Sequence, residues 1–522
     1  MGSNTIQILI AMAIYMAVVI GIGLIYAKRA NKNSEEYFLG GRSLGPWVTA
    51  MSAEASDMSG WLLMGLPGVA YWCGLADAFW TALGLAVGTY LNWLVVSRQL
   101  RRYSVRTNAI TLPEFFSNRF RENKKLIMTI AAAFILIFFT VYASSCFVTC
   151  GKLFSTLFGA PYVTMMIVGA AFVLLYTLLG GFLAESASDF MQAIVMIVAL
   201  TVIVIISTAK AGGIGAVIEN AKSIPGFLQF FGLASPSLDA AGQQIVEGGK
   251  PVFGAIADYG LLTVCSMMAW GLGYFGMPQV LLRFMAIRRE DELKRSRRIA
   301  MVWVIISLGV AVFIGIVGRQ LFPTAHLTKS AAENIFITLA TSSLPAILAG
   351  FVMAGILAAT ISSSDSYLLI AASAFAKNIY QGICKKNASD KQVMVVSRIT
   401  LLALALIGIL IALDENSVIF SIVSFAWAGF GATFGPLMLF SLFWKRTNRA
   451  GAIAGMLSGA GMVFLWKLVI SKLGGVFAIY ELLPAFVFSC ICIVVVSLLT
   501  KAPSKEIEAD FEAVRAGKVQ DA

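Results

Sequence analysis

The sequence predicts an all-α polytopic membrane protein with about thirteen transmembrane helices. The 522 residues are 59% hydrophobic and only 13% charged, with a mean hydropathy of +0.85, which is too apolar for a soluble globular protein. Apolar runs of about 20 residues, the length that spans a bilayer core of roughly 30 Å, recur along the whole chain. These runs are too long for strands and lack period-2 alternation, so helices are favoured over a β-barrel.

The first apolar run begins near Asn4 and is not followed by a small-residue cleavage site, so it is interpreted as a retained helix and not a signal peptide. Each later run is bounded by short polar or basic stretches. The expected spans, in chain order, are 4–27, 45–72, 76–98, 127–155, 161–181, 189–210, 256–286, 299–321, 345–377, 396–413, 416–443, 449–470 and 480–500.

Lysines and arginines collect in alternate loops, as expected for cytoplasmic loops. Basic clusters follow the first, third, seventh, ninth and eleventh spans, and only the short loop after the fifth lacks one. This pattern predicts an N-terminus outside the cell and an odd number of spans, with the tail at 501–522 inside. The loop at 211–255 and this tail are the only sizeable segments expected in water, and neither is long enough for a catalytic domain.

Other classes of protein fit the sequence poorly. The net charge of +12 is spread over short loops and is not gathered with aromatic residues on one surface, so no nucleic-acid partner is expected. The seven cysteines form no CxxC pair and are interpreted as small buried hydrophobes. One histidine, with no HExxH or GxxxxGK[ST] motif, leaves little for a membrane enzyme. No obligate protein partner and no organic cofactor are indicated.

Two of the expected spans carry features that interrupt a helix. The second contains Glu54 and Asp57 near mid-membrane beside Gly60, and a carboxylate at that depth should face a partner or a watery cavity. The seventh holds three glycines and Pro278 within the nine residues that begin at Trp270, which weakens the helical hydrogen-bond ladder. A channel would not require such a matched pair of breaks.

The two interruptions occupy matching places if 45–210 and 256–443 are inverted repeats of five helices each. Both then fall in the first helix of a repeat, where unwound backbone offers carbonyls to a cation and a half-helix N-terminus attracts a carboxylate. The ninth span adds four serines and Asp365 within 359–366. Adjacent hydroxyls supported by carbonyls suit sodium, a hard cation that prefers oxygen ligands.

Four motifs make the chain similar to a known family. They are YFLGGRSLGP (37–46), ASDMSGWLLMGLPG (55–68), WGLGYFG (270–276) with Pro278, and SFAWAGFG (424–431). With them the sequence resembles the solute:sodium symporter family, and within it the bacterial sodium/proline symporters, from about Glu36 to Ser504. The resemblance implies the leucine-transporter (LeuT) fold, with one extra helix before the ten-helix core and two (449–500) after it.

The resemblance also implies site residues. Sodium would be held by carbonyls of Ala55, Met58 and Ala359 and by hydroxyls of Ser362 and Ser363. Asp189 matches a position on the sodium exit route, and Asp365, if it approaches Asp189, would offer a second cation or proton site. The implied substrate-binding residues are Ser56, Asp57, Ser59, Gly60, Trp61, Tyr142, Trp270, Tyr274 and Pro278.

At two positions the sequence departs from the proline symporters, and these positions bear on which substrate is expected. The place of Glu54 usually holds a small residue, and that of Asp365 is usually uncharged. If Glu54 faces the cavity, the substrate would be a different or more basic amine. The expected function is therefore sodium-coupled symport of a small amino acid, with L-proline as substrate, in the bacterial inner membrane. The alternative is a sodium- or proton-coupled symporter of another small organic solute.

Simpler interpretations remain for several of these residues. Asp57 can cap the second half of its helix, and the serine pair can bond back to carbonyls one turn earlier. The aromatic residues at 270 and 274 share a helical face, which is also typical of packing. Residues given only a structural role are Glu185 and His326, both expected to be solvated, and the packing stripe Gly451, Gly455 and Gly459.

Overall fold

The computed structural model describes residues 3–30, 32–179 and 181–517, and it is almost entirely helical. The helices of the first half are α1 (Ser3–Ala30), α2 (Ser34–Leu39), η1 (Gly40–Arg42), α3 (Pro46–Asp57), η2 (Trp61–Gly65), α4 (Leu66–Cys73), α5 (Leu75–Leu91), η3 (Asn92–Val96), α6 (Ser97–Arg106), α7 (Leu112–Arg119), α8 (Leu126–Phe158), α9 (Tyr162–Leu179), α10 (Phe182–Lys210) and α11 (Ile214–Lys222). Four two-residue strands follow, β1 (Gly232–Leu233), β2 (Val246–Glu247), β3 (Lys250–Pro251) and β4 (Ala257–Asp258).

The helices of the second half are α12 (Leu261–Met268), η4 (Ala269–Gly276), α13 (Pro278–Ala286), η5 (Glu290–Glu292), α14 (Leu293–Leu321), α15 (Lys329–Ala332), α16 (Ile335–Ser343), α17 (Ala346–Ser373), η6 (Ala374–Cys384), α18 (Asp390–Ile411), α19 (Ile419–Phe443), α20 (Arg449–Leu468), η7 (Ile470–Leu473), η8 (Gly475–Phe477), α21 (Leu482–Leu499) and α22 (Lys505–Arg515). Every expected span therefore contains helix, although 256–286 also includes β4.

The lengths and apolar compositions of the helices do not confirm the expected count of thirteen spans. Among the described residues, ten helices are long and apolar enough to cross a membrane, and the bent pair Leu261–Gly276 and Pro278–Ala286 makes eleven. The two remaining expected spans correspond to shorter apolar helices, Trp61–Cys73 and Tyr162–Leu178. One of these is short because the α3 helix that precedes it is broken. The division into repeats at 45–210 and 256–443 stays a prediction.

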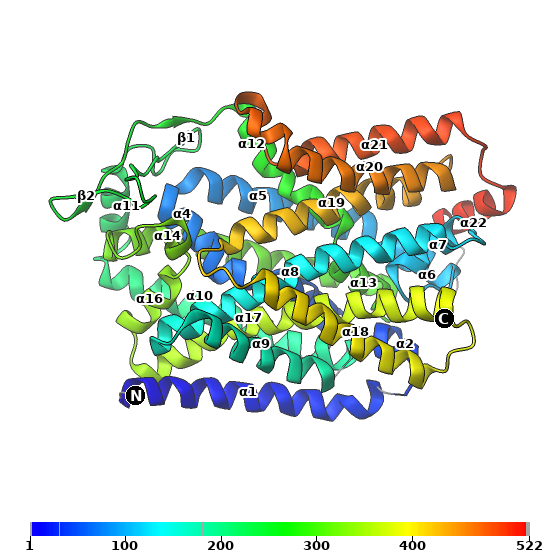
Figure 1. Ribbon diagram of the computed structural model, residues 1–522, viewed down its shortest axis with the longest axis horizontal. Coiled ribbons are helices and arrows are strands. Elements are labelled where there is room, and N and C mark those ends of the chain that lie inside the picture. Colours follow the sequence, from blue (N-terminus) through cyan, green and yellow to red (C-terminus); the bar gives the residue numbers. More distant parts are fainter. Residues whose placement is uncertain (1–2, 31, 180, 518–522) are drawn as a thin grey trace.

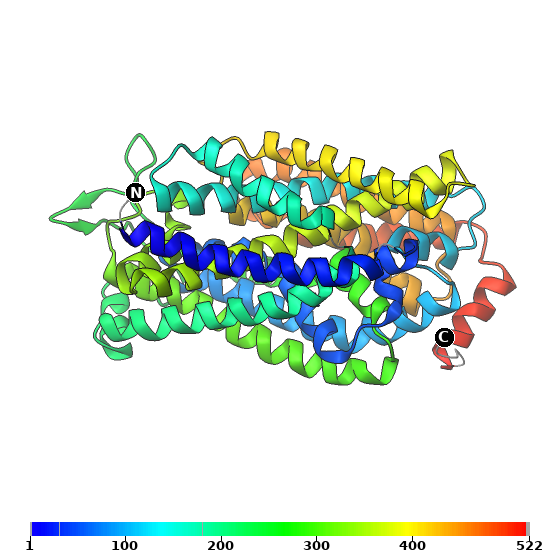
Figure 2. The ribbon, with the colours of Figure 1, turned by 90° about the horizontal axis from the view of Figure 1, so that it is seen from below.

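The long helices lie side by side with nearly common direction (Figures 1 and 2). Helix α1 forms one border of the bundle and α20 with α21 the opposite border, while α17 and α19 pass through the middle (Figure 1). The start of α1 lies at the same end as β1, β2 and α11, and α22 lies at the other end in both views. The most deeply buried long helices, α17 and α19, are thus the ones placed to carry a site.

The loop expected at 211–255 is not irregular throughout. It holds α11 and the paired strands β1–β4 and β2–β3, and extends to the start of α12. A buried arginine near the end of α14 fastens it, since Arg319 donates to Gln244 Oε1 at 2.6 Å. Its guanidinium also lies between the rings of Tyr71 and Phe253, 4.8 Å from each centroid. The expected loop is therefore a folded cap on this end of the bundle.

The opposite end gathers basic residues from loops that are distant in sequence. Arg98 and Arg102 both contact Glu290 of η5, and Arg106 and Arg121 both contact Asp510 of α22. The expected cytoplasmic tail thus contains a helix held by charge pairs, while its residues 518–522 lie outside the described residues, as do the side chains of Lys28 and Arg29 in the first basic cluster. Helix α6, which carries one of the predicted basic clusters, lies at the same end of the molecule as α22 (Figure 1).

Both predicted interruptions are present. The first α-helical segment ends at Asp57, Met58 has φ −81° and ψ 72°, and winding resumes as a π-helical turn from Trp61. The second runs as a 3-10 helix from Ala269 to Gly276, after which the chain bends by 43° and α13 begins at Pro278. Proline suits this first helical position because it has no N–H to leave unpaired.

The glycines of η4 also permit close packing, which the sequence reasoning did not anticipate. A Cβ at Gly271 would lie 2.2 Å from the carbonyl oxygen of Gly84 on α5, and one at Gly273 would lie 2.0 Å from Trp427 Nε1. The expected packing stripe on α20 is confirmed in the same way, because a Cβ at Gly455 would lie 2.4 Å from Ile493 of α21 and one at Gly459 would lie 2.1 Å from the carbonyl oxygen of Ala432.

Replacing Gly271 by alanine is expected to destabilise the protein by about 1–3 kcal/mol or more, because the obstacle is backbone and cannot rotate away. The thermal unfolding midpoint in detergent measures this. Gly309→Ala on α14 is the matched control, since nothing lies within 4 Å of its added Cβ. Equal midpoints for the two variants would show that α5 and η4 do not touch at this point.

Candidate functional site

The break in α3 faces the serines of α17. Ser362 Oγ donates to the carbonyl oxygen of Ala55 at 2.8 Å, and Ser363 Oγ donates to the same oxygen at 3.3 Å. Ser362 also lies 3.2 Å from the carbonyl oxygen of Ala359, one turn earlier on its own helix. The back-bond proposed as the simpler interpretation is therefore present, together with a contact that joins α17 to the end of α3.

These groups form a set of oxygens that fits a small hard cation. Ala55, Ala359 and the two serines are all buried, and none of their oxygens belongs to a charged group. Met58 follows within one turn, and its non-helical ψ turns its carbonyl away from the direction it would have in a continuous helix. Four of the five residues predicted to hold sodium thus meet where α3 unwinds against α17, and Met58 is the residue at which α3 unwinds. Carbonyl and hydroxyl oxygens are ligands that sodium accepts.

Asp57 links the two broken helices. Its carboxylate accepts a hydrogen bond from the Tyr274 hydroxyl at 2.7 Å and one from Gln279 Nε2 at 3.3 Å. Tyr274 precedes the bend at Met277 and Gln279 follows it. Asp57 therefore does not cap the next helical segment with its side chain, as one interpretation of the sequence held, but fastens the end of α3 to both sides of the bend.

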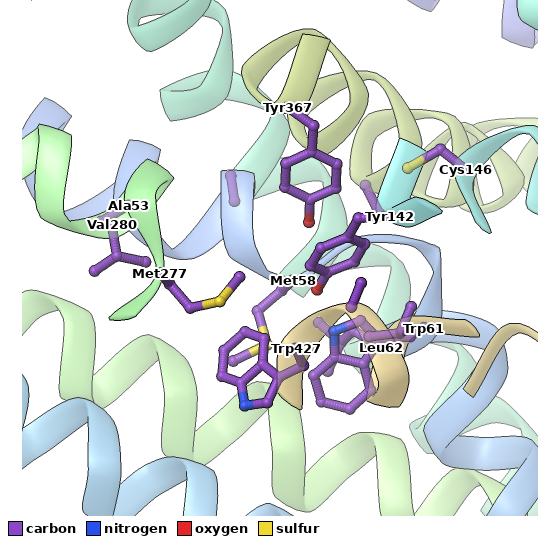
Figure 3. Close-up of a cluster of buried hydrophobic side chains, with 14 of the residues drawn as sticks. Ala53, Met58, Trp61, Leu62, Tyr142, Cys146, Met277, Val280, Tyr367 and Trp427 are labelled. Carbon is purple, nitrogen blue, oxygen red and sulfur yellow. The ribbon is translucent and has the colours of Figure 1, made fainter. Parts of the chain in front are cut away.

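Aromatic rings surround the two breaks (Figure 3). Tyr142 of α8 and Tyr367 of α17 stack with centroids 4.2 Å apart, and both hydroxyls point toward Met58 and Trp61 (Figure 3). Trp427 of α19 lies on the same side, edge-on to Tyr274 at 5.0 Å. We refer to Trp61, Tyr142, Tyr367 and Trp427 as the aromatic cluster.

Several polar atoms in and beside this cluster make no hydrogen bond within the described part of the chain. They are Ser59 Oγ, Trp61 Nε1, Tyr142 OH and Tyr367 OH, and all four residues are at most 1% exposed. Burying an unpaired polar group costs free energy. A polar ligand lying among these rings would satisfy them.

The other predicted substrate residues lie around the same point, with different surroundings. Ser56 Oγ donates to the carbonyl oxygen of Ala53 at 3.1 Å, so its one donor is used within its own helix. Gly60 packs against Thr149, whose side chain would be 2.4 Å from an added Cβ. Trp270 stacks on Tyr480 at 5.2 Å and accepts a hydrogen bond at its carbonyl from Trp427.

A buried arginine network, which sequence reasoning missed, lies beyond the serines on α17. Arg283 of α13 is fully buried and contacts Glu185 and, at 3.2 Å, Asp189. Its guanidinium also donates to Ser52 at 3.0 Å and to Ser366 at 2.9 Å. The network therefore joins α3, α10, α13 and α17.

Two expectations about this region are wrong. Arg283 was counted with the cytoplasmic basic loop, but it lies inside the bundle. Glu185 was expected to be solvated at a turn, but it is 3% exposed and also accepts a hydrogen bond from Ser366. Both lie near a predicted span end, which suggested water. Glu185 is buried because α10 begins at Phe182 and not at 189, whereas α13 ends at Ala286 as expected and Arg283 is held inside by Glu185 and Asp189.

The two residues that depart from the proline symporters are both buried. Glu54 accepts a hydrogen bond from Trp93 Nε1 at 3.2 Å, and Trp93 lies edge-on to Phe284, so the Glu54 carboxylate is engaged beside η3 and not among the aromatic cluster. Asp365 accepts a bond from the backbone N–H of Ser366 at 2.8 Å.

His326 also differs from expectation. It is half-buried, lies 2.9 Å from the Thr338 hydroxyl and packs edge-on to Tyr71. Burial lowers the pKa of His326 to about 4. The imidazole is therefore neutral at neutral pH and packs against α4 and α16.

The sequence signals for the missed residues were present but weak. Tyr367 directly follows the serine segment, and Trp427 lies inside the fourth motif. Gln279 directly follows Pro278. Each of these side chains becomes part of the site because a helix distant in sequence packs against it. A single sequence does not show which distant helices pack together.

The chain is similar to known proteins over most of its length. The sodium:solute symporter family model matches residues 37–459. A sodium/proline symporter of Haemophilus influenzae is 42% identical over 512 residues, which cover 97% of both chains. The sodium/proline symporter of Escherichia coli is 40% identical over 508 residues, covering 96% of this chain and 95% of the relative. The bacterial relatives and the apolar helices together support a multi-pass protein of the inner membrane.

Solved structures give the fold. A sodium-coupled sialic acid symporter in a substrate-bound, outward-open state superposes with a TM-score of 0.74 at 18% identity, covering 96% of this chain and 99% of the other. MhsT in complex with L-phenylalanine gives a TM-score of 0.52 at 16% identity, covering 86% and 97%. The predicted LeuT-like architecture is thereby confirmed. With a family model that matches most of its length and close relatives along nearly all of it, this chain belongs to the sodium:solute symporter family.

Proposed function

We propose that this protein couples the inward movement of sodium to the uptake of L-proline by alternating access. The observation that carries the proposal is the contact of Ser362 and Ser363 with the Ala55 carbonyl, because it forms an oxygen site where a helix is unwound. The names of its relatives as sodium/proline symporters support the substrate.

Sodium binds between α3 and α17 in this proposal. Its ligands are the carbonyl oxygens of Ala55, Met58 and Ala359 and the hydroxyls of Ser362 and Ser363. On binding, the ion replaces the hydrogen bonds that the two hydroxyls now donate, so that their lone pairs turn to the ion. The ion then ties the unwound end of α3 to α17, and Asp57 stabilises the bound charge from one turn away.

Proline lies against the aromatic cluster. Its ring packs on Trp61 and Tyr142, and its carboxylate is directed toward the amides near Ser59 and Gly60, at the start of the resumed helix, where the helix dipole favours negative charge. Glu54 is held by Trp93 beside η3, and the Asp57 carboxylate is engaged by Tyr274 and Gln279. Trp270, Tyr274 and Pro278 complete the wall on the side of η4, and Tyr274 acts through its bond to Asp57.

Sodium and substrate binding are coupled because both ligands use the same segment of the chain. Sodium orders the Met58–Gly60 segment, and the same segment presents the amides to the substrate. Each ligand therefore strengthens the binding of the other by the same factor, as linkage requires. The bonds from Asp57 to Tyr274 and Gln279 make α3 and the bent helix move as one unit.

The proposal includes an orientation in the inner membrane. The end that bears the arginine clusters and α22 faces the cytoplasm, by the positive-inside rule, and the cap formed by α11 and the short strands faces outward. Asp189 lies between the sodium site and the cytoplasmic end and receives the ion as it leaves.

Purified protein in proteoliposomes tests the function. With an inward sodium gradient, labelled proline is expected to accumulate, and an equal potassium gradient should not drive it. A panel of labelled amino acids and amines provides the comparison for substrate. Proline uptake that ignores sodium would overturn the coupling, and sodium-driven uptake of another solute alone would overturn the substrate.

A further inference from the structure

Four basic residues occupy the first turns of α14, at the end of the molecule that also carries α6 and α22. Within the described part of the chain they form no ion pair, and they are Lys294, Arg295, Arg297 and Arg298. The acidic residues directly before them, Glu290, Asp291 and Glu292, are each paired with an arginine outside this group. Cations in the first turns of a helix also oppose its dipole. An anion from outside the chain would neutralise this charge.

The basic residues continue the lipid-facing side of α14. Lys294, Arg298, Val302 and Ile305 recur at intervals of three or four residues and so share one face of the helix. Val302 and Ile305 are each 61% exposed, on a helix that is long and apolar enough to cross a membrane. Their side chains therefore contact acyl chains. Lys294 and Arg298, which are also exposed, stand where this apolar face reaches the end of the span, at the depth of the lipid headgroups.

Two aromatic residues flank the basic group. The guanidinium of Arg295 lies 5.9 Å from the ring centroid of Trp47 on α3, and that of Arg297 lies 5.4 Å from the ring centroid of Tyr90 on α5. Trp47 and Tyr90 are 49% and 43% exposed, and both residue types prefer the interface between membrane and water. A cation–π contact positions a guanidinium without neutralising it. The arginine heads are thus held near the membrane surface with their charge available.

We propose that Lys294, Arg295, Arg297 and Arg298, here called the α14 basic cluster, bind the headgroup of an anionic phospholipid. Guanidinium groups donate paired hydrogen bonds to phosphate oxygens. The acyl chains lie along Val302 and Ile305, and the rings of Trp47 and Tyr90 border the headgroup. A membrane lipid fits this site better than a soluble phosphate compound, because the apolar face of α14 continues directly from the cluster.

The bound lipid supports the broken helix. Trp47 is the second residue of α3, and the carbonyl of its neighbour Pro46 accepts a hydrogen bond from Ser296 of α14 at 3.0 Å. A headgroup held by Arg295 beside Trp47 adds a second connection between α14 and the start of α3. A ligand that binds only the folded protein stabilises it by mass action. Anionic lipid is therefore expected to raise the thermal unfolding midpoint of the wild-type protein.

Lipid titration tests the proposal without any transport. Phosphatidylglycerol and phosphatidylcholine with the same acyl chains are added to purified protein in detergent, and native mass spectrometry counts the bound molecules. Wild type is expected to bind phosphatidylglycerol at least about tenfold more tightly than phosphatidylcholine. Arg295→Gln and Arg298→Gln should each weaken phosphatidylglycerol binding about fivefold and leave phosphatidylcholine binding unchanged. Arg295→Lys and Arg298→Lys keep the charge and should retain most of the preference.

Arg289→Gln is the matched control. It removes the same charge at the same end of the molecule, but Arg289 is already paired with Asp291 and should not contribute to lipid binding. Equal affinities of wild type for the two lipids would overturn the proposal, and so would an equal loss in Arg289→Gln, which would reflect net charge alone. Displacement of the lipid by inorganic phosphate would assign the cluster to a soluble anion instead. Failure of sodium-driven proline uptake would refute the proposed function and leave this site intact.

Discussion

Replacing both Ser362 and Ser363 by alanine is expected to abolish sodium-driven uptake while the protein still folds. The substitution removes two hydroxyls from a buried set of oxygens and leaves only carbonyls, which cannot replace the hydration shell of the ion. We expect the sodium concentration for half-maximal uptake to rise at least about tenfold with either single change and about a hundredfold with both, since each factor of ten corresponds to about 1.4 kcal/mol. Sodium-dependent uptake in proteoliposomes measures this.

Two features make the result specific to the ion. The hydroxyls bond mainly to backbone carbonyls at 2.8–3.3 Å, so their loss costs the fold only about 1 kcal/mol each. Ser373→Ala, on the same helix, removes a hydroxyl that bonds to the Ile370 carbonyl at 2.7 Å and should leave the sodium response unchanged. A double variant with wild-type sodium affinity would show that the ion binds elsewhere.

The helices could be predicted from the sequence because their cause is local. A run such as 299–321 is apolar over the length of a bilayer, and the structure has α14 there. The breaks could also be predicted, since Gly60 and Pro278 weaken a helix wherever it lies. Helix ends were less certain: α10 starts at Phe182 and not at 189, and this difference changed the surroundings of Glu185.

Side-chain partners were not predictable in the same way. Arg283 reads as one of several arginines after a span, and only packing against α10 shows that it pairs with Glu185, 98 positions away. Tyr367 similarly becomes part of the aromatic cluster because α8 brings Tyr142 to it. The ion site was found through the family resemblance, and the hydrogen bond from Tyr274 to Asp57 emerged only from the fold.

Arg283→Met is expected to lower the free energy of unfolding by about 3–5 kcal/mol, the usual cost of removing one partner from a buried ion pair. The variant leaves Glu185 and Asp189 buried with no guanidinium between them. It also removes donors to Ser52 and Ser366, so the contact between α3 and α17 is weakened on the side toward α22. Thermal unfolding in detergent reports the loss, and sodium-dependent uptake should fall with it.

Neutralising Glu185, the partner of Arg283, separates the effect of the lost charge pair from the effect of lost packing. If the defect is the unpaired carboxylate, Glu185→Gln should destabilise the wild-type protein but restore part of the stability of the Arg283→Met variant, which a double-mutant cycle detects. Arg289→Met is the matched control, because Arg289 is 63% exposed and its pair with Asp291 is worth little. Additive losses in the cycle would show that Arg283 acts through packing alone. A favourable coupling would instead show that α13 is held against α10 by charge.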